Sequence, residues 1–383
     1  MKRPSNVQLL YWHNFLLYFR PLDPLAVLYF NEVTGSFTAA MGIFAISKIS
    51  AILLEIPTGI LSDRIGRKKT FILGTLTGII ATIFYALAAS SFFLLLGAAL
   101  EGTARTFFSG TRNAFLYEVL KETGAEKEYS RDLGRTSSFI HAGLGLGALA
   151  AIPFADISLR LVVAVGIIPQ ILAFLVCLFL VEPKIHLQEK QKSFSILWAA
   201  TQKLWQNKRL LVFTCAQSLA RGIDDAGYRF RSAFIAPLWP VWGISVLAVF
   251  DHIGAVITYW SAGKIIEKIT PKWIIIGFEF LTVGCKGIAV LLNNVFSPLI
   301  MVIPAFGFGP MMTAKEHIVQ NEFTDSQRAT MGSIGSLLQA LCYLVIALLM
   351  GAVADHWGPA VAILAVIVIQ LAVTPLYARF FKQ

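Results

Sequence analysis

The chain has 383 residues, of which 56% are hydrophobic and only 14% are charged, and its mean hydropathy is +0.69. Soluble domains usually carry about 25% charged residues. This composition therefore excludes an ordinary soluble protein and favours a lipid bilayer as the solvent. The formal net charge is +10. Lys and Arg gathered on the cytoplasmic face of a membrane protein account for that excess without a nucleic-acid partner.

Apolar runs of about 20 residues, long enough to cross a bilayer, recur along the whole chain. Backbone polar groups in lipid must be satisfied within their own segment, so the runs predict helices rather than strands. The expected spans, twelve in all, are Val7–Phe30, Ala39–Leu61, Thr70–Ala89, Phe92–Val119, Gly134–Phe154, Leu159–Val181, Leu210–Ala236, Val241–Ala262, Trp273–Leu292, Ser297–Val319, Thr330–Val353 and Pro359–Phe380.

These spans predict an all-α membrane protein built from two pseudo-symmetric bundles of six helices each. Residues 1–182 are expected to form the first bundle and residues 210–383 the second. The connecting residues 183–209 contain the amphipathic stretch "SFSILWAATQKLWQNKRL", which is expected either to lie along the cytoplasmic membrane surface or to act as a plain linker.

A weak internal repeat supports the division into halves. "GILSDRIGRK" after the second span has a degenerate counterpart in "GKIIEKITPK" after the eighth. At one constant offset, Gly59 corresponds to Gly263 and Asp63 to Glu267. Further pairs at this offset are Arg20 with Asp224, Lys48 with His252, Arg112 with Glu316 and Glu118 with Glu322.

Lys and Arg are distributed unevenly over the connections between spans. Alternate connections are rich in basic residues, whereas the remaining ones hold only Arg160. The basic side includes both chain ends and the segments 64–69, 121–135, 183–209 and 264–272. This bias predicts an even number of spans with both termini in the cytoplasm.

Charged residues inside the spans are the candidates for function, because they are costly in lipid and usually line a cavity or find a partner. In the first span, Arg20 and Asp23 are flanked by Pro21 and Pro24. The prolines are expected to break the helix, and broken helices mark binding sites in carriers. The second span carries Lys48.

The fourth and seventh spans hold denser charge. Glu101, Arg105, Phe108 and Arg112 follow helical spacing and are expected to form one stripe on the fourth span. The seventh span contains "ARGIDDAGYRFRS". There, Arg221 is expected to meet Asp224 or Asp225, and Arg229 to meet Asp225. The tenth span contains Gly307, Gly309 and Pro310, which suggest a break.

Two interpretations of the charged set remain open: its members pair with one another and stabilise the fold, or several bind substrate and protons. The predicted substrate and proton residues are Arg20, Asp23, Lys48, Glu101, Arg105, Arg112, Arg221, Asp224, Asp225, Tyr228, Asp251 and His252. Burial raises the pKa of an unpaired carboxyl group. The leading proton carriers are therefore Asp23, Asp224, Asp225 and Asp251, followed by His252 because imidazole titrates near neutrality.

One short stretch resembles a known family. The pattern G-x-x-x-D-R-x-G-R-K-K, which begins at Gly59, resembles the signature loop between helices 2 and 3 of the major facilitator superfamily. The segments "LLEIPTG", "SGTRNAFLYEVLKETG", "QRATMGSIGSLLQ" and "GAVADHWG" are similar to bacterial members. The resemblance covers essentially the whole chain and says little about the substrate. It implies a location in the inner membrane of a bacterium.

The resemblance implies a conformational latch made of Gly59, Asp63, Arg64, Gly66, Arg67 and Glu118. Gly59 and Gly66 would allow close backbone approach and a tight turn. Asp63 would face the positive end of the eleventh helix, and Arg67 would pair with Glu118. These contacts would hold the two halves together on the cytoplasmic side when the carrier faces outward.

Two further family motifs match only in part. Arg105 resembles the arginine of the second motif, but Ser109 stands where the family usually has glycine. The fifth span has Gly143, Gly145 and Gly147 but lacks the Gly-Pro of the antiporter motif. This departure weakens the hypothesis of a drug antiporter.

The sequence thus predicts a secondary active transporter, and not an enzyme, that works by alternating access. Proton-coupled export of a small polar or charged organic compound is the favoured function, with an acidic group of the substrate near Arg20, Lys48, Arg105 or Arg112. The chain lacks a Walker-type phosphate loop and a catalytic Ser/His/Asp or Cys/His set. It is expected to need no cofactor or resident metal and to work as a monomer.

Three alternatives stay open. The first is an importer of a polar nutrient or a metal chelate. The second is a carrier of a divalent metal held by Asp23, Asp224, Asp251 and His252, since oxygen and imidazole ligands suit such ions. The third is a sensor or scaffold that has the fold without transport activity.

Overall fold

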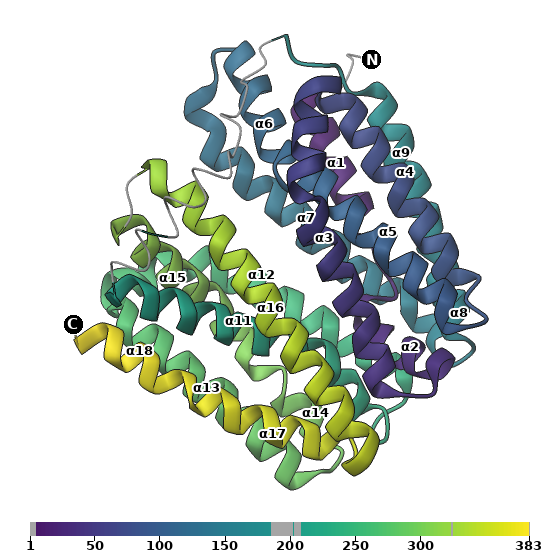
Figure 1. The fold of residues 1–383 in the computed structure, drawn as a ribbon, viewed down its shortest axis with the longest axis vertical. Helices are drawn as coiled ribbons and strands as arrows, with labels where there is room; N and C mark the ends of the chain where they lie inside the picture. The colour runs from purple at the N-terminus through teal and green to yellow at the C-terminus, as the bar shows by residue number, and fades with distance from the viewer. Residues whose placement is uncertain (1–4, 185–201, 203–207, 323–324, 383) are drawn as a thin grey trace. The chain divides into compact units, whose positions relative to one another are not determined.

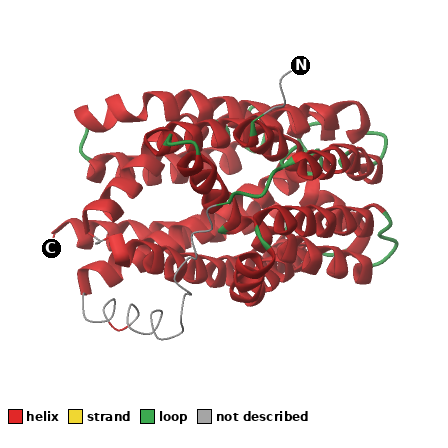
Figure 2. Cartoon of the chain, turned by 90° about the horizontal axis from the view of Figure 1, so that it is seen from above, coloured by secondary structure: helices red, strands yellow, loops and turns green. Residues whose placement is uncertain are grey.

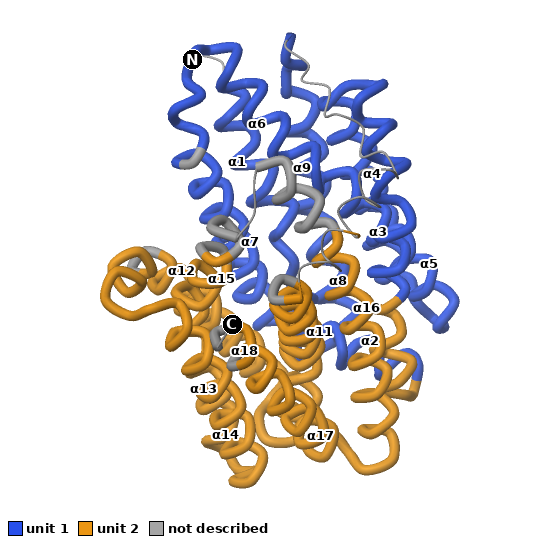
Figure 3. The backbone as a smooth tube through the Cα atoms, turned by 60° about the vertical axis from the view of Figure 1, so that its left-hand side comes forward, with its two compact units in different colours: residues 1–34, 46–191 blue, residues 35–45, 192–383 orange. Residues whose placement is uncertain are grey.

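The computed structural model describes residues 5–184, 202, 208–322 and 325–382. Within these residues every regular element is a helix (Figures 1 and 2). The chain divides into two compact units: residues 1–34 and 46–191, and residues 35–45 and 192–383 (Figure 3). Most of the expected linker, residues 183–209, lies outside the described residues.

Unit 1 contains the first half of the expected spans. Its elements are α1 (Asn6–Leu17), η1 (Asp23–Leu25), α2 (Ala26–Thr34), most of α3 (Phe37–Ile65), α4 (Arg67–Ala86), α5 (Ser91–Ser109), α6 (Thr111–Glu122), η2 (Glu126–Glu128), α7 (Tyr129–Ala155), α8 (Leu159–Val165) and α9 (Ile167–Phe179).

Unit 2 contains the second half together with the first turns of α3. Its further elements are α11 (Lys208–Ile235), α12 (Val241–Lys268), α13 (Pro271–Leu292), α14 (Ser297–Ile300), η3 (Ile303–Gly307), α15 (Phe308–Glu322), α16 (Asp325–Trp357), α17 (Pro359–Leu371) and α18 (Val373–Lys382).

The helix breaks follow the local sequence. The first span is interrupted between Leu17 and Ala26, where Pro21 and Pro24 withhold backbone donors, so the predicted break is confirmed. The 3₁₀ helix η3 ends at Gly307, directly before α15 begins, which confirms the predicted break in the tenth span. The fourth span, predicted as one run, is instead divided at Gly110.

Nine helices in the described part of the chain are long and apolar enough to cross a membrane. The predicted number of twelve stays a prediction. The first and fourth expected spans are divided into shorter helices, and α11 carries charge along its length. Large apolar side chains are widely exposed, among them Leu53 at 69% and Leu291 at 80%. Lipid is the environment in which such surfaces are stable.

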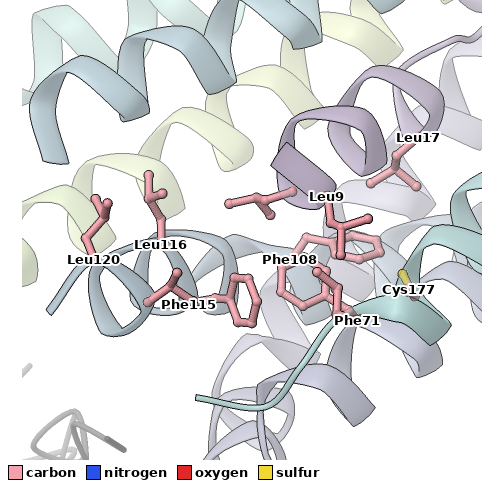
Figure 4. Packing of buried hydrophobic residues seen from close by; sticks show 11 residues of the cluster. Leu9, Leu17, Phe71, Phe108, Phe115, Leu116, Leu120 and Cys177 are labelled. Carbon is pink, nitrogen blue, oxygen red and sulfur yellow. The ribbon is translucent and has the colours of Figure 1, made fainter. Parts of the chain in front are cut away.

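An apolar core holds unit 1 together. Leu9 and Leu17 of α1 pack with Phe71 of α4, Phe108 of α5 and Cys177 of α9 (Figure 4). The polar ring of His13 is buried in the same region, with its Nε2 3.1 Å from Thr75 Oγ1. This packing fixes the helices that carry the charged residues described next.

Candidate functional site

Unit 1 gathers its predicted charges around one carboxylate. Arg20 Nη1 lies 2.6 Å and Arg105 Nη2 2.8 Å from the same oxygen, Glu101 Oε1. The phenol of Tyr85 donates to the other oxygen, Oε2, at 2.9 Å. The interruption of the helix after α1 places Arg20 beside Glu101, which is 81 residues away in the sequence. We call Arg20, Glu101, Arg105 and Arg112 the arginine cluster.

Arg112 completes the arginine cluster from α6, beyond the break at Gly110. Its Nη2 donates to Tyr18 Oη at 3.1 Å, and its guanidinium lies 5.3 Å from the centre of the Tyr18 ring. The predicted stripe from Glu101 to Arg112 is thus carried by two helices, α5 and α6, rather than by one continuous helix. The structure nevertheless brings Arg112 and Arg20 to the same tyrosine, whose ring centre is 5.9 Å from the Arg20 guanidinium.

Guanidinium groups outnumber the carboxylates that bind them. Among the described residues, the buried Nε atoms of Arg105 and Arg112 have no hydrogen-bond partner. Asp23 is half-buried and influences Arg105 electrostatically. Lys48 is also half-buried in α3, next to the point where Ser47 meets α5 at Gly102. The arginine cluster therefore holds more guanidinium groups than carboxylates, and two of its buried Nε donors are unsatisfied within the described part of the chain.

Unit 2 pairs its charges differently from the prediction. Asp224 Oδ1 accepts hydrogen bonds from Lys286 and Gln370, and Asp225 Oδ2 accepts one from Gln339. Among the described residues, Arg221 forms no ion pair, and its Nη2 lies 4.0 Å from Met312 Sδ. The expected pairing of Arg221 with either aspartate was thus wrong. Lys286 and Gln370 bind Asp224 instead, and Gln339 binds Asp225.

The remaining predicted residues of unit 2 lie on α11 and α12. Arg231 binds Asp251 with both terminal nitrogens, one of them 3.2 Å from Oδ1. Tyr228 is 39% exposed, and its ring lies under the Arg231 guanidinium. His252 follows Asp251 and is half-buried. Arg229 stacks over Phe44 at 4.6 Å.

The connection between α3 and α4, around which the latch residues lie, is a turn of one residue rather than a loop. Gly66 alone separates α3 from α4 and has φ +93°, a conformation that glycine adopts most readily. The predicted tight turn is confirmed at Gly66. Gly59 instead lies inside α3, and a Cβ added there would meet no described atom within 4 Å.

Arg67 is the centre of the latch. Its side chain is 5% exposed and binds Glu118 (0% exposed) at 3.2 Å and Asp63 (27% exposed) at 2.9 Å. The predicted pair of Arg67 with Glu118 is confirmed. Asp63 and Arg64 are themselves exposed at the end of α3.

One latch partner was not predicted. Glu182 accepts hydrogen bonds from the backbone nitrogens of Arg67 and Lys68 at 2.6 and 2.8 Å. A carboxylate at the N-terminus of a helix satisfies free N–H groups and is stabilised by the helix dipole. The sequence could have indicated this partner. Glu182 directly follows the sixth span, and that connection is expected on the same side of the membrane as the latch.

Sequence reasoning also missed Glu279, Lys286, Lys315 and Gln370 in unit 2. Lys286 and Gln370 bind Asp224, and Glu279 and Lys315 are fully buried. The signal was present, because isolated charges interrupt the apolar run of α13. No group of three His, Cys, Asp or Glu residues in the described ranges is placed to hold a metal ion.

The described chain is thus a multi-pass helical membrane protein with charged side chains buried between its helices. Residues 17–341 match the sequence profile of the Major Facilitator Superfamily. The match spans most of the chain, and the protein belongs to this superfamily of transporters. The resemblance of the latch sequence to that family is confirmed.

Known proteins resemble the chain in fold more than in sequence. The chain is 35% identical over 88 residues to the uncharacterized transporter BU466 of Buchnera aphidicola subsp. Acyrthosiphon pisum (strain APS). That match covers 23% of this chain and only 21% of the relative, so about a fifth of the relative's length is matched.

Solved structures of transporters match over nearly the full length. The nucleoside transporter NupG gives a TM-score of 0.80 at 14% identity, covering 99% of this chain and 98% of that one. An inward-facing bacterial homolog of the human lysosomal transporter Spinster gives 0.78 at 16% identity, covering 98% and 96%. A POT family transporter in complex with 5-aminolevulinic acid gives 0.79 at 12% identity, covering 98% and 95%. At these identities the likeness concerns the fold.

Proposed function

We propose that the protein is a proton-coupled secondary transporter that exports a small organic compound carrying an acidic group. The single observation that carries the substrate class is the arginine cluster, in which Arg20 and Arg105 share one oxygen of Glu101. A carboxylate or phosphate is the natural partner for guanidinium donors left over in such a site.

Exposure supports the assignment of roles within the arginine cluster. The side chain of Arg105 is 40% exposed, that of Arg20 is 22% exposed, and that of Glu101 is 16% exposed. Arg105 is therefore the residue proposed to meet the substrate, while Glu101 and Tyr85 keep the guanidinium groups in place. The other proposed substrate residues are Asp23 and Lys48 in unit 1 and Arg221, Asp225 and Tyr228 in unit 2.

Comparison with transporter structures is consistent with an acidic ligand but does not select it. A POT family transporter of similar fold was crystallised with 5-aminolevulinic acid, which carries an acidic group, whereas NupG is a nucleoside transporter. The charge of the arginine cluster favours the first kind of substrate. The basic connections of the sequence support a location in the bacterial inner membrane with both termini in the cytoplasm.

The latch is proposed to control the cytoplasmic side of the carrier. Arg67 joins α3, α4 and α6 through Asp63 and Glu118, and Glu182 joins the same turn to the segment that follows α9. A rigid, polar turn of this kind is suited to form and break contacts as a whole during alternating access. Asp63 is the exposed acid that would make those contacts.

Proton flux in inside-out vesicles tests the proposed function. Vesicles with an acid interior are exposed in turn to organic acids, amino acids, amphiphilic cations and metal chelates, and collapse of the pH gradient is recorded. Organic acids or zwitterions are expected to collapse the gradient, and Arg105→Gln is expected to abolish the effect. The exposed Arg131, which binds Glu128 outside the arginine cluster, supplies the matched control Arg131→Gln.

The outcomes separate the alternatives. A response to amphiphilic cations alone, or an unchanged response in Arg105→Gln, would overturn the acidic substrate. Accumulation in right-side-out vesicles, with no response in inside-out vesicles, would indicate the importer. No response to any compound in either orientation would favour a sensor or scaffold.

A further inference from the structure

A buried network of charges crosses the helices of unit 2. Glu279 on α13 faces Lys315 on α15, with 3.6 Å between Oε1 and Nζ, and both side chains are 1% exposed. Lys286, two turns further along α13, lies 3.4 Å from Asp224 Oδ1 on α11. Two acids and two bases thus share an interior in which charge is costly.

Gln370 on α17 connects the two ion pairs. Its Nε2 lies within hydrogen-bond distance of both acids, at 3.1 Å from Glu279 Oε2 and 3.2 Å from Asp224 Oδ1. Its Oε1 accepts a hydrogen bond from Lys286 Nζ at 3.0 Å. Because this amide is fully buried, its hydrogen bonds must follow any change in charge at either acid.

Unit 1 has neutral residues at the positions related to these charges. The offset that relates Gly59 to Gly263 also relates Thr75 of α4 to Glu279 and Thr82 of α4 to Lys286. Gln170 of α9 donates to Thr82 Oγ1 at 2.7 Å, much as Gln370 of α17 bonds Lys286. In unit 1 the positions that this offset relates to Glu279 and Lys286 are therefore held by threonines, one of which is bonded to a buried glutamine.

The same offset relates the neutral Thr111 to Lys315. Thr111 is buried and bonded to Ser62 at 3.0 Å. Neutral hydroxyl groups are thus sufficient to pack these helices in unit 1. Unit 2 keeps a glutamate and two lysines in their place, at a desolvation cost of several kcal/mol per ion, which indicates a task other than packing.

The Glu279–Lys315 pair is incompletely bonded. At 3.6 Å the pair is beyond hydrogen-bond distance. Among the described residues, Lys315 Nζ and Glu279 Oε1 have no hydrogen-bond partner, and the Tyr377 hydroxyl is buried without one as well. Lys315 Nζ lies 5.3 Å from the centre of the Tyr377 ring. A loosely held carboxylate can gain a proton without breaking a two-pronged ion pair such as that between Asp251 and Arg231.

We propose that Glu279 is the proton-binding group of the transport cycle and that Gln370 transmits its state of protonation to α11. The inference rests on the proposed proton-coupled transport. A proton from water adds to the Glu279 carboxylate and forms a neutral acid. Lys315 then loses its counter-charge, and Oε2 becomes a weaker acceptor for Gln370.

The groups facing Glu279 set its response to pH. They are Lys315 of α15, Gln370 of α17, Tyr377 of α18, Asp224 of α11, and Lys286 of α13 itself. Arg221 of α11 acts on Lys315 and Tyr377. When Gln370 changes its hydrogen bonds, Asp224 is the acid that it reaches on α11. Because α11 also carries Arg221 and Asp225, proton binding at Glu279 reaches the proposed substrate residues through one helix.

Infrared difference spectroscopy tests proton binding without a known substrate. The purified full-length protein in lipid is titrated from mildly alkaline to mildly acid pH, and the carbonyl band of protonated carboxylic acids is followed. We expect a band from a water-poor site that disappears in Glu279→Gln and persists in Asp251→Asn. Persistence of every such band in Glu279→Gln would overturn the proposal.

A double variant keeps the test valid if the single one misfolds. Glu279→Gln alone leaves a buried lysine unpaired, whereas Glu279→Gln with Lys315→Gln removes both charges and imitates the neutral network of unit 1. We expect the double variant to fold and to lack the same band. If the Glu279–Lys315 pair only stabilised the fold, the double variant would keep substrate-driven proton flux. The proposal requires the double variant to lose that flux.

Exchange of substrate between two sides at equal pH separates this proposal from the transport function. We expect the double variant to retain exchange of whichever compound drives proton flux in the wild type, and to lose only the proton flux. If the double variant also lost exchange, the proposal that Glu279 serves only proton coupling would be overturned. If no compound drives flux in the wild type, the proposed function fails, while the infrared band still decides whether Glu279 binds a proton.

Discussion

Arg67 offers a direct comparison of a buried and an exposed ion pair that share one guanidinium. Glu118 is 0% exposed and Asp63 is 27% exposed, while Arg67 itself is 5% exposed. Removal of one partner from a buried pair costs about 3–5 kcal/mol. We expect Glu118→Gln to cost about 3 kcal/mol, the lower end of that range, because Arg67 keeps Asp63 and Ser62 as partners.

Asp63→Asn is expected to cost much less. Its ion pair is partly exposed to solvent, and pairs of this kind contribute roughly 0.2–1 kcal/mol. The two changes should therefore differ by about 2 kcal/mol, which is more than a tenfold difference in the folding equilibrium. Both substitutions replace a carboxylate by its amide beside the same arginine, so the contrast reports the burial of Glu118 together with its two contacts to Arg67, against the single contact of Asp63.

Reversible unfolding in mixed micelles with increasing dodecyl sulfate, followed by tryptophan fluorescence, measures both free energies. Glu122→Gln is the matched control, because Glu122 lies exposed one turn after Glu118 on α6, and little change is expected there. An equal loss in Glu118→Gln and Asp63→Asn, or a larger loss in Asp63→Asn, would refute the argument from burial.

Three further predictions concern the latch and the helix contacts. The Asp63→Asn variant should insert into the membrane, keep near wild-type stability and bind substrate, but it should not transport substrate in vesicles. Full transport by this variant would contradict the latch. Asp355 accepts hydrogen bonds from the backbone nitrogens of Phe37 and Thr38 at 2.6 and 3.0 Å, so Asp355→Ala should cost about 1 kcal/mol as a lost helix cap, and Asp355→Asn less. A Cβ at Gly102 would lie 2.2 Å from Ser47 O, so Gly102→Ala should cost about 1–3 kcal/mol by overpacking. Its control is Gly277→Ala, where a Cβ meets no described atom within 4 Å, and equal thermal stability of the two glycine variants would refute the contact.

Much of the architecture was predictable because it depends on local properties of the sequence. Helical spans follow from hydropathy, since lipid leaves the backbone no other partner than itself. The break in the first span follows from Pro21 and Pro24, and the turn at Gly66 from the freedom of glycine. The superfamily was recognisable because the latch sequence repeats a short pattern of charge and glycine.

The partners of the buried charges were decided only by the tertiary structure. Neighbours along the helix made Arg221 the expected partner of Asp224, yet Lys286 and Gln370 from α13 and α17 take that place. Glu101 likewise holds Arg20 from a segment 81 residues away. Helical periodicity states which side chains share a face, but which other helix meets that face depends on packing. The sequence by itself therefore determined where charge is buried in this protein, and the packing of helices determined which charges meet.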